Sequence, residues 1–226
     1  MGRYDRNIGT ITIEEQQLLK TKSVCVIGCG GLGGGVIENL VRMGVGRLTV
    51  VDGDSFDVSN LNRQVLSNEG NLGKSKALEA AEQMHQINGE VEIKPIEGLL
   101  SADNAREIIG GCDVVVDALD NVEARLALED ACDVEEIPLI HGAISGWNGQ
   151  VGVVMPGSGI LHQIYESDME DGSPTNPSFT PAVVSALQAS ETIKVLLGRE
   201  ESLRNKLLMI DLLDHEYEVI DFGGAL

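Results

Sequence analysis

The sequence is poor in aromatic residues and in basic residues. Only 3% of its 226 residues are aromatic, and 16 Lys and Arg stand against 36 Asp and Glu, which gives a formal net charge of −20. A nucleic-acid backbone is held mainly by clustered Lys and Arg, so this charge balance argues against a nucleic-acid partner. It favours a partner with a basic face. The few cations deserve individual inspection.

Long apolar runs and paired cysteines are also missing. No apolar stretch approaches the ~18 residues of a membrane-spanning helix, and the N-terminus does not read as a signal peptide. The four cysteines, Cys25, Cys29, Cys112 and Cys132, form no CxxC pair, which favours free thiols in a reducing compartment. We expect a cytoplasmic protein.

What the sequence does contain is an alternation of short apolar runs with amphipathic segments, and this predicts βαβ units around a parallel sheet. The expected fold class is α/β: a Rossmann-like, mostly parallel sheet flanked by helices, with an antiparallel C-terminal extension of the sheet. Predicted strands lie at 23–27, 48–51, near 91, and at 113–117, 138–141, 150–155, 207–210 and 217–220. Predicted helices lie at 13–20, from the glycine-rich turn to 43, and at 74–88, 104–109, 122–134 and 181–197.

A glycine-rich turn, Gly28-Cys29-Gly30-Gly31-Leu32-Gly33, follows the first predicted strand and opens the next helix. Such a turn offers backbone N–H groups and a positive helix terminus to phosphate oxygens. Asp52 closes the second strand, where a carboxylate can accept hydrogen bonds from ribose hydroxyls. Together they predict a nucleotide site, and at this point NAD and other nucleotides remain open.

The polar segment after Asp52 narrows the choice. It contains Asp54 and the run Asn60-Leu61-Asn62-Arg63-Gln64. A dinucleotide site has no need of Asn-x-x-Arg-Gln, whereas a triphosphate needs cationic and amide donors for its extra phosphates. A solvated turn capped by Asn60 is the alternative reading.

Two further segments carry candidate phosphate or metal ligands. Gly73-Lys74-Ser75-Lys76 opens a helix, and a lysine in the first turn is disfavoured by the helix dipole unless an anion offsets it. Asp120-Asn121 follow a buried-type strand, at the sheet edge where α/β proteins bind ligands. A carboxylate there suits Mg²⁺ shared with phosphates. The alternatives are two solvated lysines and a simple helix cap.

In combination these segments resemble the ThiF/MoeB/HesA family of adenylyltransferases, which is related to the activating enzymes of ubiquitin-like proteins. The resemblance covers nearly the whole chain in order. It runs through residues 3–8, 28–33, 52–54, 59–64, 73–76, 120–125, 141–143, 149–151 and 187–194. The combination is specific, although its separate parts are not.

The resemblance implies ATP-dependent adenylation of the C-terminal carboxylate of a small ubiquitin-like sulfur-carrier protein or peptide, typically ending in Gly-Gly, with release of pyrophosphate. It also implies a homodimer in which Arg6 reaches the nucleotide of the other subunit. The implied catalytic residues are Arg6, Arg63, Lys76 and Asp120, with Asp120 as the Mg²⁺ ligand. The implied ATP site comprises Gly28, Gly30, Gly31, Leu32, Gly33, Asp52, Asp54, Asn60, Arg63, Gln64, Lys76, Asp120, Asn121 and Arg125.

One domain of this length suffices for such an enzyme. We expect an N-terminal helical arm at 1–22, a nucleotide-binding half at 23–142 and a partner-binding and dimerisation half at 143–226. The polar stretch 166–180 is long for a connection inside a compact domain. Within it, residues 172–180 are a candidate crossover that covers the incoming peptide tail.

The sequence departs from many family members in two ways. Their zinc-binding CxxC pairs have no counterpart, because the first pair would fall near residues 161–165, where no cysteine stands. We expect no zinc site. The loop before the last helix also lacks the cysteine used for thioester or persulfide chemistry, so we expect adenylation without a covalent enzyme intermediate.

Two rival functions are a Rossmann oxidoreductase that binds NAD, and a non-catalytic dimeric scaffold of the same fold. The first leaves Arg63, Lys76 and Asp120 without a role. The second conflicts with a complete set of ATP-binding residues. The sequence does not identify the carrier, the pathway (thiamine, molybdopterin or another), the source of any sulfur, or whether the acidic surface serves partner recognition.

Overall fold

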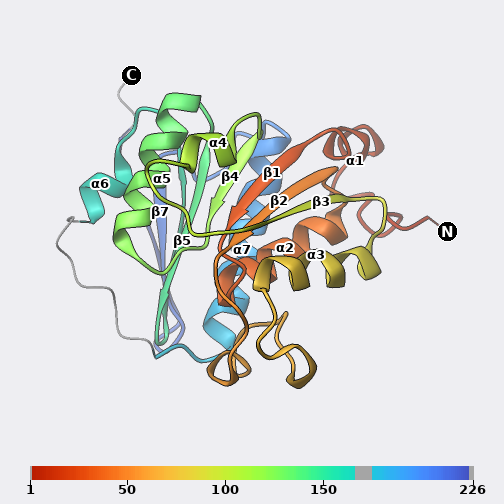
Figure 1. The fold of residues 1–226 in the computed structure, drawn as a ribbon. Coiled ribbons are helices and arrows are strands. Elements are labelled where there is room, and N and C mark those ends of the chain that lie inside the picture. The colour runs from red at the N-terminus through yellow and green to blue at the C-terminus, as the bar shows by residue number, and fades with distance from the viewer. Residues whose placement is uncertain (1, 166–174, 224–226) are drawn as a thin grey trace.

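The computed structural model describes residues 2–165 and 175–223. Its strands form one sheet in the order β3-β2-β1-β4-β5-β6-β7-β8 (Figure 1). The strands are β1 (Ser23–Ile27), β2 (Arg47–Asp52), β3 (Glu92–Glu97), β4 (Val114–Asp117), β5 (Leu139–Ser145), β6 (Asn148–Val154), β7 (Lys206–Asp211) and β8 (Glu216–Asp221).

The sheet is parallel over its first five positions and antiparallel over its last three. Strands β3, β2, β1, β4 and β5 run parallel to one another. Strands β6, β7 and β8 then follow as an antiparallel extension from β5. The predicted fold class is confirmed.

Helices cover both faces of the sheet (Figure 1). They are α1 (Ile13–Leu19), α2 (Gly31–Met43), α3 (Lys76–Ile87), α4 (Ala105–Ile109), α5 (Val122–Glu135), α6 (Ile160–Ile164) and α7 (Phe179–Leu196), with short 3₁₀ turns at Val58–Asn60 and Glu69–Asn71. Helices α2, α3 and α7 pack on one face around a core of Val, Ile and Leu. Helices α4, α5 and α6 pack on the other face. Over residues 2–165 and 175–223, no helix combines the length and apolarity needed to cross a membrane.

The predicted elements match the observed ones closely, with one helix unforeseen. The strand expected near residue 91 is β3, and the helix 13–20 is α1 with a Thr12–Glu15 capping box. Helix α6 gave no sequence signal because it spans five residues and begins after Gly159 without a side-chain cap of its own. Its N–H groups are satisfied instead from α5, where Glu129 accepts from Leu161 and His162, both at 3.0 Å.

The glycine-rich turn depends on two positions that leave no room for a side chain. Gly28 has φ +98°, and a Cβ atom there would lie 2.6 Å from the carbonyl oxygen of Ala118. A Cβ atom on Gly33 would lie 1.7 Å from the carbonyl oxygen of Gly28. The backbone after β1 therefore folds directly onto the start of α2 and onto the end of β4.

Replacement of Gly33 by Ala is expected to destabilise the protein by about 3 kcal/mol or more, because the new methyl group overlaps a backbone oxygen that cannot rotate away. The free energy of unfolding in urea measures the loss. Gly98→Ala is the control, since a Cβ atom there meets no atom within 4 Å; its cost should stay below about 1 kcal/mol. Equal stabilities of the two variants would contradict the packing described.

Candidate functional site

A cavity of about 730 Å³ opens at the carboxyl ends of the parallel strands, the edge at which open α/β sheets bind ligands. The glycine-rich turn, the end of β2 and the turn after β4 meet there. The predicted residues on its wall are Gly28, Gly30, Gly31, Leu32, Asp52, Asp54, Arg63, Gln64, Lys76, Asp120, Asn121 and Arg125. Segments more than 80 residues apart in the sequence thus form one site.

The glycine-rich turn is tied to β2 through Asp52. One carboxylate oxygen of Asp52 accepts the backbone N–H of Cys29 at 2.7 Å, and the other accepts that of Asp54 at 2.8 Å. Helix α2 begins at Gly31, so its first N–H groups, which have no intrahelical acceptor, point toward the cavity mouth. A carboxylate has about four acceptor positions, which leaves Asp52 capacity for ribose hydroxyls.

Arg63 and Gln64 form the part of the wall next to the glycine-rich turn. The Arg63 guanidinium donates to the Ser59 carbonyl at 2.8 Å and to Oδ1 of Asn62 at 2.9 Å. Gln64 is buried against Gly30, and its Oε1 has no hydrogen-bond partner among the described residues. Both side chains present polar groups to the cavity.

Lys76 is a buried cation at the first position of α3. Its side chain is 9% exposed, and Nζ lies 3.0 Å from Oδ2 of Asp54, whose side chain is 67% exposed. The helix dipole disfavours a cation at this position, and the Asp54 carboxylate offsets that cost. The neighbouring Lys74 projects outward and pairs with Glu79 at 3.1 Å. Only one of the two lysines therefore reaches the cavity.

The turn that carries Asp120 is held by two side chains that bind the two backbone polar groups of Leu119. Oδ1 of Asp117 accepts the backbone N–H of Leu119 at 3.0 Å. Nη2 of Arg125 donates to the carbonyl of Leu119 at 2.6 Å. The Asn121 side chain then caps α5 by accepting the N–H of Ala124 at 2.9 Å. Asp120 itself is exposed and accepts no hydrogen bond from any residue within 2–165 and 175–223.

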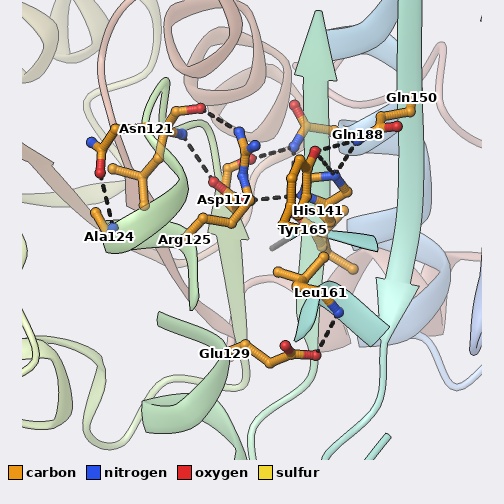
Figure 2. A network of polar contacts seen from close by, with 12 residues as sticks. Asp117, Asn121, Ala124, Arg125, Glu129, His141, Gln150, Leu161, Tyr165 and Gln188 are labelled. Atoms are coloured by element: carbon orange, nitrogen blue, oxygen red, sulfur yellow. Dashed lines mark hydrogen bonds and ion pairs between the residues drawn. The ribbon is translucent and has the colours of Figure 1, made fainter. Parts of the chain in front are cut away.

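Beneath this turn lies a buried polar network (Figure 2). Nε of Arg125 donates to Oδ2 of Asp117 at 2.9 Å, and Nδ1 of His141 lies 2.7 Å from the same oxygen. Asp117 and His141 are both fully buried. Gln188 of α7 donates to the carbonyl of Asp117 at 2.8 Å, which joins the network to the opposite face of the sheet.

The charges of the network follow from burial and pairing. Burial alone would raise the pKa of Asp117, but Arg125 and the hydrogen bond from His141 outweigh it and hold that pKa below the usual value. Burial lowers the pKa of His141, against the opposing effect of Asp117. At neutral pH the network therefore contains a carboxylate, a guanidinium and a neutral imidazole whose Nδ1 carries the proton.

The network ends at the cavity surface in Gln150 and Tyr165. Nε2 of Gln150 lies 3.0 Å from Nε2 of His141 and also donates to the Tyr165 hydroxyl. The Arg125 guanidinium lies over the Tyr165 ring, 4.8 Å from its centroid. Both Gln150 and Tyr165 line the cavity.

The cavity wall and the network beneath it also include residues to which the sequence assigned no role. Asp117, Gln150 and Tyr165 lie far apart along the chain, and only the fold brings their side chains together. The motifs around His141 and Gln150 contributed to the resemblance without a function, and Tyr165 carried no signal. Further unforeseen members of the wall are Leu99, Leu100, Leu119, Val122, Asn148 and Met209.

Three predicted site residues do not line this cavity. Gly33 serves the packing of the glycine-rich turn. Asn60 is buried and accepts the N–H of Asp57 at 3.0 Å, which caps the 3₁₀ turn that precedes Arg63. Arg6 is exposed in the N-terminal segment, outside the cavity of its own chain.

Comparison with known proteins identifies the family. The model of the ThiF family matches residues 4–223. The chain belongs to the ThiF family. It is 36% identical to the SAMP-activating enzyme E1 of Haloferax volcanii, over 98% of this chain and 85% of that protein. It is 37% identical to the sulfur carrier protein adenylyltransferase of Thermus thermophilus, over 96% of this chain and 85% of that protein. These names confirm the predicted enzyme class, an adenylyltransferase.

A longer relative and a solved structure are also similar to this chain. The chain is 33% identical to the adenylyltransferase and sulfurtransferase MOCS3 of Xenopus laevis over 98% of this chain, and it spans about half of that protein. Among solved structures, E. coli MccB with ATP superposes with a TM-score of 0.85 at 23% identity, covering 99% of this chain and 72% of that one. This second likeness concerns the fold alone.

The neutral state of His141 predicts a pH dependence of stability. Below the ordinary imidazole pKa of 6.5, the unfolded chain binds a proton that the folded chain does not, so the free energy of unfolding falls as pH falls. The pKa of Asp117 lies below its usual 3.8, and that group does not titrate in this window. Urea unfolding from about pH 7.5 to about 5.5 should show a slope that His141→Asn reduces by up to about 1.4 kcal/mol per pH unit.

The control is His215→Asn, which changes an exposed histidine in the β7–β8 turn. It should keep the slope of the unaltered protein. An unaltered slope in His141→Asn would show that His141 takes up its proton in the folded state.

Proposed function

We propose that this chain adenylates the C-terminal carboxylate of a ubiquitin-like sulfur-carrier protein, using ATP and releasing pyrophosphate. The observation that carries the proposal is the convergence of Arg63, Lys76 and Asp120 on one cavity beside the glycine-rich turn. Two cations and a carboxylate suit a triphosphate with Mg²⁺, and a dinucleotide has no use for this set. The names of the relatives, a SAMP-activating enzyme and a sulfur carrier adenylyltransferase, support the choice of partner.

The glycine-rich turn and Asp52 would hold the AMP part of the nucleotide. The N-terminus of α2 offers backbone donors to the α-phosphate. The hydrogen bond from the Cys29 N–H holds Asp52 close to the glycine-rich turn. Leu99, Leu100 and Val122 supply apolar wall for the base. The nucleoside would thus rest between apolar side chains, with its ribose hydroxyls toward Asp52.

Arg63 and Lys76 would hold the β- and γ-phosphates. Lys76 has its ammonium inside the cavity and its present partner, Asp54, on the surface. Triphosphate oxygens bring more negative charge to that ammonium than one solvated carboxylate does. Arg63 donates to a carbonyl and an amide oxygen through Nη1, and a guanidinium carries further donors for phosphate.

Asp120 has the properties of a Mg²⁺ ligand. Its carboxylate is exposed on the cavity wall, and both backbone polar groups of the preceding residue, Leu119, are hydrogen-bonded. Over the described ranges 2–165 and 175–223, no group of three His, Cys, Asp or Glu side chains is arranged to hold a metal alone, which suits an ion shared with phosphates. Such an ion would neutralise charge on the phosphates.

The chain's own contribution is position and charge. A carboxylate nucleophile needs no general base, and phosphoryl-type chemistry depends mainly on alignment and electrostatic stabilisation. Arg63 and Lys76 would stabilise pyrophosphate as it departs. The Asp117–Arg125 pair would keep Asp120 in place while this happens.

The reaction would proceed without an enzyme thioester. Burial raises the pKa of the Cys29 and Cys132 thiols, and the hydrogen bond to Cys112 raises that of Cys25. The same bond lowers the pKa of Cys112, but Cys112 precedes β4 and lies at the amino ends of the parallel strands, away from the cavity. No cysteine lines the cavity wall that the structure describes.

The assembly would be a homodimer with composite sites. Arg6 does not reach the cavity of its own chain, and its exposure leaves it available to a second subunit. Residues 1–22 would form the arm that carries it, residues 23–142 the nucleotide-binding half, and residues 143–226 the half that binds the partner and the second subunit. The proposed crossover at 172–180 lies partly outside the described residues, which leave out 166–174.

Removal of a phosphate-binding cation tests the site. Arg63→Ala and Lys76→Ala should each weaken ATP binding in the presence of Mg²⁺ by about 10- to 100-fold, since bonds to charged groups contribute roughly 1.5–3 kcal/mol. Isothermal titration calorimetry gives the dissociation constants. Lys74→Ala removes the same charge two residues away, outside the cavity, and should bind as the unaltered protein does. Binding of NADH but not of ATP would overturn the proposed function.

The rate of ATP–pyrophosphate exchange tests both the proposed partner and the proposed role of Asp120. ATP–pyrophosphate exchange should require a carrier protein with a free C-terminal Gly-Gly and should disappear with the amidated carrier. Asp120→Asn should slow exchange at least about 100-fold, because loss of a metal-ion contact costs several kcal/mol. Asp214→Asn, an exposed change in the β7–β8 turn, should have no effect. Full exchange by Asp120→Asn would show that this carboxylate has another role.

A further inference from the structure

Tyr165 joins the buried network, where it contacts Gln150 and Arg125 (Figure 2), to the cavity, whose wall it lines. Tyr165 follows α6, and its N–H donates to the Leu161 carbonyl at 2.9 Å. Leu161 is fully buried, and its own N–H is bound by Glu129. The backbone that bears Tyr165 is therefore anchored in the core, while its side chain is part of the cavity wall.

The hydrogen-bonding capacity of His141 is already used. Asp117 is a carboxylate and can only accept, so the bond of 2.7 Å places the imidazole proton on Nδ1. Nε2 then has a single lone pair. Gln150 lies 3.0 Å from Nε2 and Tyr165 lies 3.3 Å from it. The closer donor, the Gln150 amide, takes that lone pair.

The Tyr165 hydroxyl, in contrast to His141, keeps a hydrogen-bonding group available. Its oxygen accepts an N–H of Gln150, and the Arg125 guanidinium lies beside it, over the ring. With the Gln150 amide closer to Nε2 of His141, the phenolic O–H keeps only the longer contact of 3.3 Å to that atom. Burial raises the pKa of Tyr165, which keeps this proton in place at neutral pH. A protonated donor is left at the cavity wall.

We propose that this hydroxyl donates a hydrogen bond to the acyl group of the substrate: to the carboxylate oxygen that does not attack phosphorus, and then to the carbonyl oxygen of the acyl-adenylate. The inference rests on the proposed function. Asn148, Gly149 and Gln150 bring β6 to the same part of the wall. Arg125 adds positive charge close to the carboxylate.

Tyr165 would keep its proton throughout the reaction. One carboxylate oxygen forms the new bond to the α-phosphorus, and the bond from that phosphorus to pyrophosphate breaks with its electron pair on the leaving group. The other carboxylate oxygen becomes the acyl carbonyl. The hydroxyl holds that oxygen before and after the step, so it orients the nucleophile and retains the product.

Two nucleotide analogues isolate this contact without a partner protein. Adenosine 5′-sulfamate lacks an acyl group, and 5′-O-(N-glycylsulfamoyl)adenosine differs from it only by a glycyl acyl group. The unaltered protein should bind the glycyl compound more tightly. Tyr165→Phe keeps the ring over Arg125 and should retain the affinity for adenosine 5′-sulfamate. It should reduce the ratio by which the glycyl compound binds more tightly by roughly 5- to 10-fold, which corresponds to the loss of one hydrogen bond.

The control is Tyr217→Phe, which removes a hydroxyl from the exposed edge strand β8 and should leave both affinities unchanged. If Tyr165→Phe keeps the full advantage of the glycyl compound, the inference is wrong. If the unaltered protein binds neither analogue, the proposed function itself fails.

Stability is monitored in parallel because Tyr165→Phe leaves a Gln150 N–H without an acceptor. If that variant also loses adenosine 5′-sulfamate, Tyr165→Phe with Gln150→Leu replaces it, which removes the unpaired N–H together with the donor to Nε2 of His141. The same affinity ratio then decides: a retained glycyl advantage overturns the inference, and a lost one supports it.

Discussion

The buried ion pair between Asp117 and Arg125 is the constraint on which the site depends. It lies at the end of β4, at the centre of the sheet, where both side chains are almost completely withdrawn from water. A buried pair is costly to desolvate and adds stability only when its remaining hydrogen bonds are satisfied. Here they are satisfied by Leu119, His141 and the backbone after β4, and the turn with Asp120 is fixed as a consequence.

The pair also links the two faces of the molecule. Gln188 of α7 binds the Asp117 carbonyl from one face, while Arg125 of α5 and Tyr165 after α6 approach from the other. The cavity edge of the sheet and its antiparallel extension therefore share one polar centre. Under the proposed function, this arrangement would bring a triphosphate, a metal ion and a peptide carboxylate into a single cavity, which adenylation requires.

Local chemistry explains why much of the fold was predictable. Several elements are predicted by only a few neighbouring residues: the capping box of α1, the glycine-rich turn before α2 and the continuous apolar runs of β1 and β4. Helix α6 could not be predicted in this way. Its N-terminus is capped by Glu129, 31 residues before the helix begins, and such a cap exists only after α5 has packed against the sheet.

The sequence by itself determined the Rossmann-like α/β class, the glycine-rich turn and the cations and carboxylates that are proposed for ATP, because these follow from short motifs and their order. Only the tertiary structure decided that Lys76 rather than Lys74 faces the cavity, that Arg125 binds the Leu119 carbonyl, and that Tyr165 joins the buried network to the cavity wall. These outcomes depend on which atoms meet across strands and helices distant in the chain. Hydrogen-bond capacity can be counted only once those partners are in place.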